Sequence, residues 1–306
     1  MSKSLRGTLF LLIAALIWGS AFVAQSVAMD FVGPFTYQTV RSFTASGFIM
    51  ILAFLNDLIK KKKGTYVKPT GKSRLKLIKG GCICGLALGI AANLQQFGIK
   101  YTTVGKAGFL TALYILFVPV LCLIFFKRIP SLKVWCAILI AVAGLYLLCM
   151  NGGFSLQAGD TFVLLCSVAF AVHIICCDKF AEGADCFRLS AIQFFVNGLV
   201  SALLMLIFEP NGISVFAENL SEVWFTVLYA AIMSSGIAYT LQIFGQRDVN
   251  PTVASLLMSL ESVFAVLSGI IVLQEIPTFK EAVGCVLMFS AIILSQLPDR
   301  KKGLEG

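Results

Sequence analysis

The chain has 306 residues, of which 58% are hydrophobic and 13% are charged, and its mean hydropathy is +0.92. Soluble domains carry about a quarter charged residues, so this composition excludes an ordinary soluble enzyme and favours a protein that lies in a lipid bilayer. The formal net charge of +9 at pH 7 then has two explanations, a nucleic-acid-binding surface or the basic loops of a membrane protein.

Ten apolar segments follow one another along the chain, separated by charged or Gly- and Pro-rich breaks. They cover residues 7–28, 34–55, 77–99, 105–126, 133–151, 159–178, 188–208, 222–244, 251–273 and 280–297. A helix that spans a bilayer takes roughly 20 mainly apolar residues, whereas barrel strands are about ten residues long and alternate apolar with polar residues. The sequence therefore predicts an all-α membrane protein with ten transmembrane helices, and its short connections leave no room for a soluble catalytic domain.

The Lys and Arg residues gather on one side of the predicted membrane. If the N-terminus is cytoplasmic, 20 of the 24 fall in cytoplasmic segments, nine of them between residues 60 and 79, and three fall on the other side. Cytoplasmic loops of membrane proteins carry such an excess of positive charge. We therefore expect a multi-pass protein of the cell (cytoplasmic) membrane with both termini in the cytoplasm. A basic loop beside anionic lipid explains the net charge without a nucleic-acid partner.

Two stretches of the chain are nearly the same. Residues 89–98 read GIAANLQQFG and residues 236–245 read GIAYTLQIFG, with seven of ten positions identical at an offset of 147. The first five segments therefore repeat as the last five, which divides the chain into repeats 1–151 and 152–306. Because five is odd, the second repeat enters the membrane from the opposite side. Such inverted repeats occur in transporters that open one midplane site to each side in turn.

Three phrases give the chain a family resemblance. The first segment contains ALIWGSAF, the fourth contains AGFLTALYILFVP, and the ninth contains SLLMSLESVFAVLSGIIVLQE, which ends at Glu275. With ten helices in two halves, the chain resembles the EamA-type branch of the drug/metabolite transporter superfamily. The resemblance implies a transporter, most often an exporter. The chain departs from the family pattern at Ser262, where many members have proline, and at Lys127 and Arg128, where many have a glutamate.

Glu261 is the only carboxylate near the predicted bilayer centre, about ten residues into the ninth segment. A polar group at this depth needs a partner, a cavity or a function. Its repeat mate at the offset of 147 is Tyr114. Two roles stay open for Glu261. It either binds a proton or a substrate amine, or it is a protonated carboxyl that hydrogen-bonds a neighbouring helix.

Other polar and aromatic side chains lie at similar depth and are candidates for the same site. They are Trp18, Arg41, Asn93, Gln95, Ser235, Tyr239 and Gln242. Ser235, Tyr239 and Gln242 are spaced by four and three residues, which predicts one helix face. The two glutamines either line the site or bond neighbouring helices. Arg41 either snorkels outward or presents its guanidinium to a substrate carboxylate.

The sequence carries no motif for ATP hydrolysis, metal binding or covalent catalysis. It has no GxxxxGK[ST] loop, a single histidine, His173, and no second acid beside Glu261. We therefore predict no cofactor, no metal and no catalytic residue. The leading hypothesis is a secondary active exporter of a small organic metabolite, such as an amino acid or a related compound, with protons as a candidate coupling ion. The alternatives are an uncoupled facilitator or exchanger and, third, an intramembrane enzyme. A homodimer is compatible with the sequence.

Overall fold

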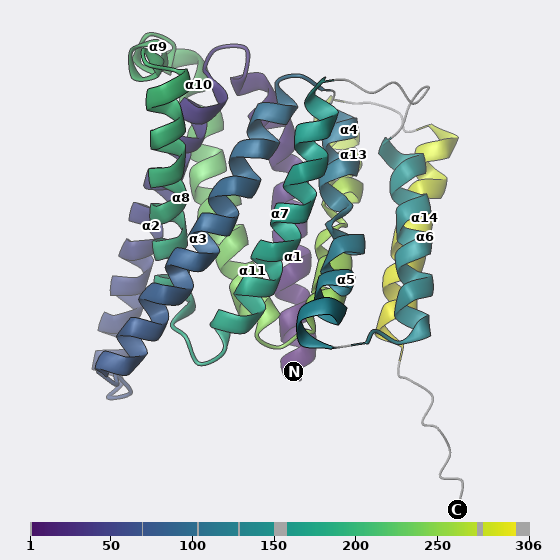
Figure 1. Cartoon of the computed structure of the whole chain (residues 1–306), viewed down its shortest axis with the longest axis horizontal. Coiled ribbons are helices and arrows are strands. Elements are labelled where there is room, and N and C mark those ends of the chain that lie inside the picture. The colour runs from purple at the N-terminus through teal and green to yellow at the C-terminus, as the bar shows by residue number, and fades with distance from the viewer. Residues whose placement is uncertain are drawn as a thin grey trace, which may run out of the picture.

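The computed structural model describes residues 2–68, 70–102, 104–127, 129–149, 158–273 and 278–297, and these form a helical bundle without strands (Figure 1). Glu275 and Arg128 lie outside the described residues. The helices are α1 Lys3–Ala28, α2 Pro34–Lys62, α3 Gly71–Ile99, α4 Val104–Ala112, α5 Tyr114–Phe126, α6 Leu132–Cys149, α7 Ala158–Ala181, α8 Cys186–Phe208, α9 Gly212–Glu218, α10 Leu220–Tyr229, a π-helix Ala230–Ala238, α11 Tyr239–Gln246, α12 Pro251–Met258, α13 Glu261–Leu273 and α14 Phe279–Gln296.

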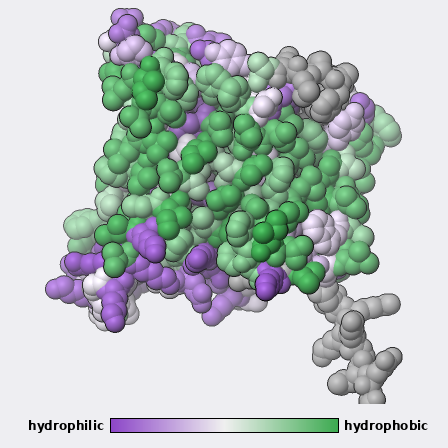
Figure 2. Space-filling model, viewed as in Figure 1, coloured by the Kyte–Doolittle hydropathy of each residue, from purple (hydrophilic) through white to green (hydrophobic). Residues whose placement is uncertain are grey.

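Eight helical spans within the described residues are long and apolar enough to cross a membrane, and two shorter apolar helices cover Leu132–Leu148 and Pro251–Leu267. Figure 2 shows a broad hydrophobic band across the middle of the visible face of the bundle and hydrophilic residues at its ends, most densely at the end that holds the N-terminus. Large apolar side chains such as Phe125, which is 71% exposed, face outward. Such a surface suits lipid and not water. The all-α membrane protein expected from the sequence agrees with this structure, while the number of ten transmembrane helices stays a prediction.

Two of the predicted segments are broken helices, and a third contains a π-helix. Segment 105–126 divides at Leu113 into α4 and α5, and segment 251–273 divides at residues 259–260 into α12 and α13. Segment 222–244 contains the π-helix between α10 and α11. At both breaks a backbone N–H donates to the carbonyl three residues earlier instead of four. Leu113 N donates to Leu110 O, and Leu260 N donates to Leu257 O. The first break lies at Leu113 and not at Pro119, which the helix α5 accommodates.

Helices from the two halves of the chain pack side by side. The pairs α3–α7, α2–α8 and α6–α14 make the most extensive contacts, and α1 lies against α10, the π-helix, α11 and α13. Close approach of α6 and α14 depends on two glycines that face each other. A Cβ on Gly284 would lie 2.7 Å from the carbonyl oxygen of Gly144, and a Cβ on Gly144 would lie 2.9 Å from that of Gly284. Any side chain there would push the helices apart.

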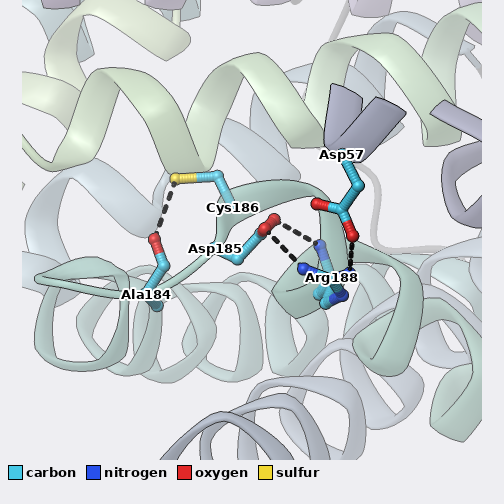
Figure 3. Close-up of polar contacts among 5 residues, drawn as sticks. All are labelled: Asp57, Ala184, Asp185, Cys186 and Arg188. Atoms are coloured by element: carbon cyan, nitrogen blue, oxygen red, sulfur yellow. Dashed lines mark hydrogen bonds and ion pairs between the residues drawn. The ribbon is translucent and has the colours of Figure 1, made fainter. Parts of the chain in front are cut away.

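Helices α2 and α8 run antiparallel and are joined at one end by an ion pair. Arg188, in the first turn of α8, binds Asp57 near the end of α2 (Figure 3). The carboxylate of Asp185 holds the arginine from the other side, accepting from Arg188 Nη1 at 3.0 Å and from the Arg188 backbone N–H at 3.1 Å. We call Asp57, Asp185 and Arg188 the Arg188 clamp. It lies at the end of the bundle where α1 begins (Figure 1).

The opposite ends of α2 and α8 are joined by a different contact. Glu209, directly after α8, accepts hydrogen bonds from Phe35 N at 3.1 Å, from Thr36 N at 2.8 Å and from Thr36 Oγ1 at 2.6 Å. These N–H groups belong to the first turn of α2, which has no capping side chain of its own. A carboxylate satisfies such free N–H groups and favours the positive end of the helix dipole. We call Phe35, Thr36 and Glu209 the Glu209 clamp.

Candidate functional site

Tyr114 and Glu261 meet in the centre of the bundle, because each is the first residue after a helix break. Tyr114 begins α5 and Glu261 begins α13. The Tyr114 hydroxyl donates a hydrogen bond to Glu261 Oε1 at 3.3 Å, and both side chains are buried. A carboxylate at a helix N-terminus lies in the favourable field of the helix dipole. The two repeat mates thus form one polar contact, although 147 positions separate them.

Helix α1 packs closely against the start of α13 at Gly19. A Cβ on Gly19 would lie 2.5 Å from the carbonyl oxygen of Glu261 and 2.7 Å from Ala265 N. Only glycine permits α1 to pass so close to the start of α13. The neighbouring Trp18 contacts the π-helix, where its Nε1 donates to the carbonyl of Ser234 at 3.2 Å.

A cavity of about 40 Å³ lies around the Tyr114–Glu261 contact. Its walls combine aromatic, apolar and hydrogen-bonding side chains from ten helical elements. The lining residues are Trp18, Phe22, Gln25, Arg41, Gln95, Thr111, Tyr114, Phe170, His173, Ile174, Ser234, Tyr239, Gln242, Met258 and Glu261. One water molecule needs roughly 10–15 Å³, so this volume holds a few waters. Sites for small molecules are usually about 300–1,000 Å³, so the cavity is smaller than such a site in this conformation.

Seven of the nine candidates from the sequence line this one cavity, namely Trp18, Arg41, Gln95, Tyr114, Tyr239, Gln242 and Glu261. The two glutamines of the duplicated phrase are both among them. Gln95 Nε2 donates to Thr111 Oγ1 at 3.2 Å, and Gln242 Nε2 donates to Gln246 Oε1 at 3.0 Å. The acceptor oxygen of Gln242 has no hydrogen-bond partner among the described residues. It is available to a donor on a ligand or a water molecule.

The other two candidates lie elsewhere. Asn93 donates to Ser201 Oγ at 2.8 Å and to the carbonyl of Gly89 at 2.7 Å, which ties α3 to α8 away from the cavity. Ser235 is fully buried and accepts from Arg41 instead of lining the cavity. The spacing that predicted one face for Ser235, Tyr239 and Gln242 assumed an α-helix. The π-helix over Ala230–Ala238 widens the turn and rotates Ser235 away.

Arg41 is held inside the bundle by three neutral groups. Its Nε donates to Ser235 Oγ at 2.6 Å, its Nη1 to Gln25 Oε1 at 2.7 Å and its Nη2 to Ser234 Oγ at 2.9 Å. The residue is only 5% exposed, so its side chain does not snorkel outward. No carboxylate of the described residues lies within 4.0 Å of it. The guanidinium therefore borders the cavity as a positive charge without an ion-pair partner in the described part of the chain.

Several lining residues were not among the sequence candidates. Gln25 and Phe22 lie on the face of α1 that carries Trp18, at spacings of three and four residues, and that spacing was visible in the sequence. Thr111 lies one turn before Tyr114 but across the break. His173 Nε2 contacts Gln193 Oε1 at 3.1 Å, while its Nδ1 has no partner among the described residues. Across the described residues, no group of three His, Cys, Asp or Glu side chains is placed to hold a metal.

Comparison with known proteins gives one consistent answer. The model of the EamA-like transporter family matches the chain twice, over residues 5–150 and 157–297. An "Uncharacterized transporter" of Archaeoglobus fulgidus is 30% identical over 299 residues, which cover 96% of this chain and 87% of that protein. Protein PecM of Dickeya dadantii is 30% identical over 141 residues, or 45% of this chain and 46% of PecM.

A solved structure shares the fold. Described only as "Crystal structure of protein", it aligns with a TM-score of 0.75 over 100% of both chains at 20% sequence identity. At that identity the likeness concerns the fold alone. The family and the relatives named as transporters point to a transporter and not to an enzyme.

Proposed function

The chain belongs to the EamA-like transporter family, and from this premise we propose that it is a secondary active exporter of a small organic metabolite, such as an amino acid or a related compound. The observation that carries the proposal is the Tyr114–Glu261 contact, which joins two helix breaks inside a polar and aromatic cavity. In transporters, discontinuous helices at mid-membrane form the substrate and ion sites. The seven lining candidates, with Ser235 behind Arg41, are the binding residues we propose.

The architecture that we propose has ten transmembrane helices in two inverted repeats, residues 1–151 and 152–306. Support comes from matched features in the two halves. The breaks at Leu113 and Leu260 differ by the repeat offset of 147, and the family model matches each half once. Two similar halves with opposite orientation can exchange conformations, which opens a shared site first to one side and then to the other.

We further propose that the end of the bundle carrying the Arg188 clamp faces the cytoplasm, in the cell membrane. Helix α1 begins at this side and helix α14 ends there (Figure 1), and hydrophilic residues are densest at the same side (Figure 2). The basic residues between 60 and 79 lie at the end of α2, in the connection to α3 and in the first turns of α3, at the same end. This arrangement obeys the excess of positive charge on the cytoplasmic side.

Glu261 is the group that we propose to couple transport to protons. It is the only carboxylate among the residues that line the cavity, and a carboxyl that exchanges one proton per cycle links solute movement to the proton gradient. In antiport, protons move towards the alkaline side and solute moves towards the acid side. Proteoliposomes with equal solute on both sides and an imposed pH difference should therefore accumulate solute in the more acidic compartment.

The variant Glu261→Gln tests this coupling. It keeps the shape of the side chain but cannot exchange a proton, so the pH-driven accumulation should vanish, while exchange of labelled for unlabelled solute at equal pH can persist. Glu222→Gln is the matched control, because Glu222 is exposed on α10 and should leave accumulation unchanged. If parent protein shows exchange but no accumulation under a pH difference, the protein is an uncoupled facilitator or exchanger. If Glu261→Gln accumulates solute as the parent does, Glu261 has no coupling role.

A further inference from the structure

Arg41 is a buried positive charge that the described part of the protein does not neutralise. An ionised group inside a membrane protein is costly unless it is paired or serves a function. Its three acceptors, Ser235, Gln25 and Ser234, orient the guanidinium through neutral oxygens, which supply hydrogen bonds but no opposite charge. The arrangement fixes the side chain and leaves its charge for another partner.

The guanidinium also keeps free hydrogen-bond donors. Arginine has five N–H groups, one on Nε and two on each terminal nitrogen. The hydrogen bonds to Ser235, Gln25 and Ser234 use one on each nitrogen. One N–H therefore remains on Nη1 and one on Nη2. These two N–H groups are free to donate to the oxygens of a carboxylate, the anion that arginine commonly binds.

The surroundings of Arg41 suit the rest of a small organic acid. Arg41 and Glu261 line the same cavity, yet they form no ion pair. The same walls carry aromatic side chains, among them Trp18 and Tyr239, which are in edge contact at a ring-centroid distance of 4.8 Å. An anionic head at Arg41 with an apolar or aromatic remainder against these rings would bury both parts in matching surroundings.

We propose that the transported solute carries a carboxylate and that Arg41 is the residue that binds it. This inference rests on the proposed function, since it assigns the substrate class of the same cavity. The carboxylate replaces the water around the two free N–H groups and neutralises the buried charge. Neutral solutes and amines leave the guanidinium unpaired inside the bundle, so the site rejects them.

The first experiment compares metabolites in the medium and in cells that do or do not produce the full chain. The solutes whose distribution depends on the protein should carry a carboxylate. A set made up of neutral compounds or amines without a carboxylate would overturn the assignment to Arg41 and leave the transport function intact. If no solute depends on the protein, the proposed function itself is wrong.

The second experiment uses each solute so identified together with its primary amide, in proteoliposomes. The parent protein should prefer the carboxylate by at least about tenfold in kcat/KM, the effect of losing a hydrogen-bonded charge pair. Arg41→Gln should lose that preference, and Arg41→Lys should retain part of it with a higher KM. Arg6→Gln, which removes an exposed arginine at the start of α1, is the control and should keep the preference.

A purely structural arginine would give a different pattern. Arg41 joins α1, α2 and the π-helix, so Arg41→Gln can slow transport by loosening these helices. In that case the variant transports the carboxylate and its amide more slowly by the same factor, and the proposal fails. If Arg41→Gln does not fold, the parent protein and Arg41→Lys still test the proposal. The parent should prefer the carboxylate and Arg41→Lys should keep part of that preference. A parent that transports the acid and its amide equally would contradict a carboxylate site.

Discussion

At the scale of single residues, hydrogen bonds of polar side chains join the helices at the centre of the molecule. Tyr114 donates to Glu261, Trp18 donates to the Ser234 carbonyl, and Arg41 donates to three oxygens. An unpaired polar group in such surroundings costs about 1–3 kcal/mol. These contacts therefore stabilise the arrangement of the helices around the cavity.

The Tyr114→Phe variant tests the contact between the two breaks. Without the hydroxyl, Glu261 Oε1 loses the donor at 3.3 Å, and we expect the free energy of unfolding to fall by about 1–2 kcal/mol. Thermal unfolding of the purified protein in detergent measures the loss as a lower Tm. Tyr146→Phe is the matched control, because Tyr146 is 43% exposed on α6 and its hydroxyl makes no hydrogen bond within the described residues. An equal Tm for parent and Tyr114→Phe would mean that the contact contributes nothing to stability.

At the scale of helices, α2 and α8 are joined at both ends by clamps that correspond to each other. In the first helices of the two halves the repeat offset is 152, which aligns residues 7–10 (GTLF) with residues 159–162 (GDTF). At this offset Asp57 corresponds to Glu209 and Thr36 to Arg188. In each clamp an acid at the end of one helix binds the start of the other. The chemistry differs, since Arg188 supplies a charge where Thr36 supplies a hydroxyl and backbone N–H groups. The Glu209 clamp therefore acts as a helix cap, and the Arg188 clamp acts as an ion pair.

Removing the cap should destabilise the protein measurably. In Glu209→Gln the amide keeps one acceptor oxygen for the three donors of Phe35 and Thr36 and loses the charge that favours the start of α2. Loss of a cap costs about 0.5–2 kcal/mol, so we expect a Tm lower by a few degrees, on the order of 2–4 °C per kcal/mol. Glu218→Gln on the neighbouring α9 changes an exposed carboxylate and should leave the Tm unchanged. A Tm shift of the same size in both variants would contradict the capping role.

The helices themselves could be predicted from the sequence, but their ends and breaks only in part. From hydropathy, the second segment was predicted to end at residue 55, whereas α2 continues to Lys62. A helix extends beyond the lipid into charged residues that prefer water, and hydropathy does not include that part. Neither break contains Pro or Gly: Leu113 lies between Ala112 and Tyr114, and Leu260 lies between Ser259 and Glu261. Hydropathy therefore did not predict where the helices break. The breaks follow from packing against neighbouring helices, as the close approach of Gly19 to Glu261 illustrates.

The candidate site was predictable to the extent that it follows helix faces and the repeat. The depth of Glu261 in its segment and the repeat offset of 147 predicted that Glu261 and Tyr114 belong to one site. The spacing along α1 also points to Gln25. The π-helix changed the spacing between Ser235 and Tyr239, and Asn93 faces Ser201 on α8 instead of the cavity. Which face of a helix meets which neighbour is a property of the whole bundle, and a periodic pattern within one helix does not contain it.

At the scale of the whole molecule, the closed cavity and the two closed clamps describe one state. A volume of about 40 Å³ admits no metabolite, so entry and exit require movement of the helices. If the two repeats exchange conformations, the offset of 152 exchanges the clamps, since Asp57 corresponds to Glu209 and Thr36 to Arg188. One clamp would then open when the site faces one side, and the other clamp would open when it faces the opposite side.

Cross-links across the clamps test this exchange. In a background with the native cysteines replaced, the pair Thr36→Cys with Glu209→Cys joins α2 and α8 at one end, and the pair Asp57→Cys with Arg188→Cys joins them at the other. We expect each cross-link, made with a short thiol reagent, to stop solute exchange in proteoliposomes, because a carrier needs both openings in every cycle. The same double variants before cross-linking are the reference, and a reducible reagent should restore their rate on cleavage. Transport at the reference rate with either end joined would instead make α2 and α8 a fixed axis, and the openings would then lie between other helices.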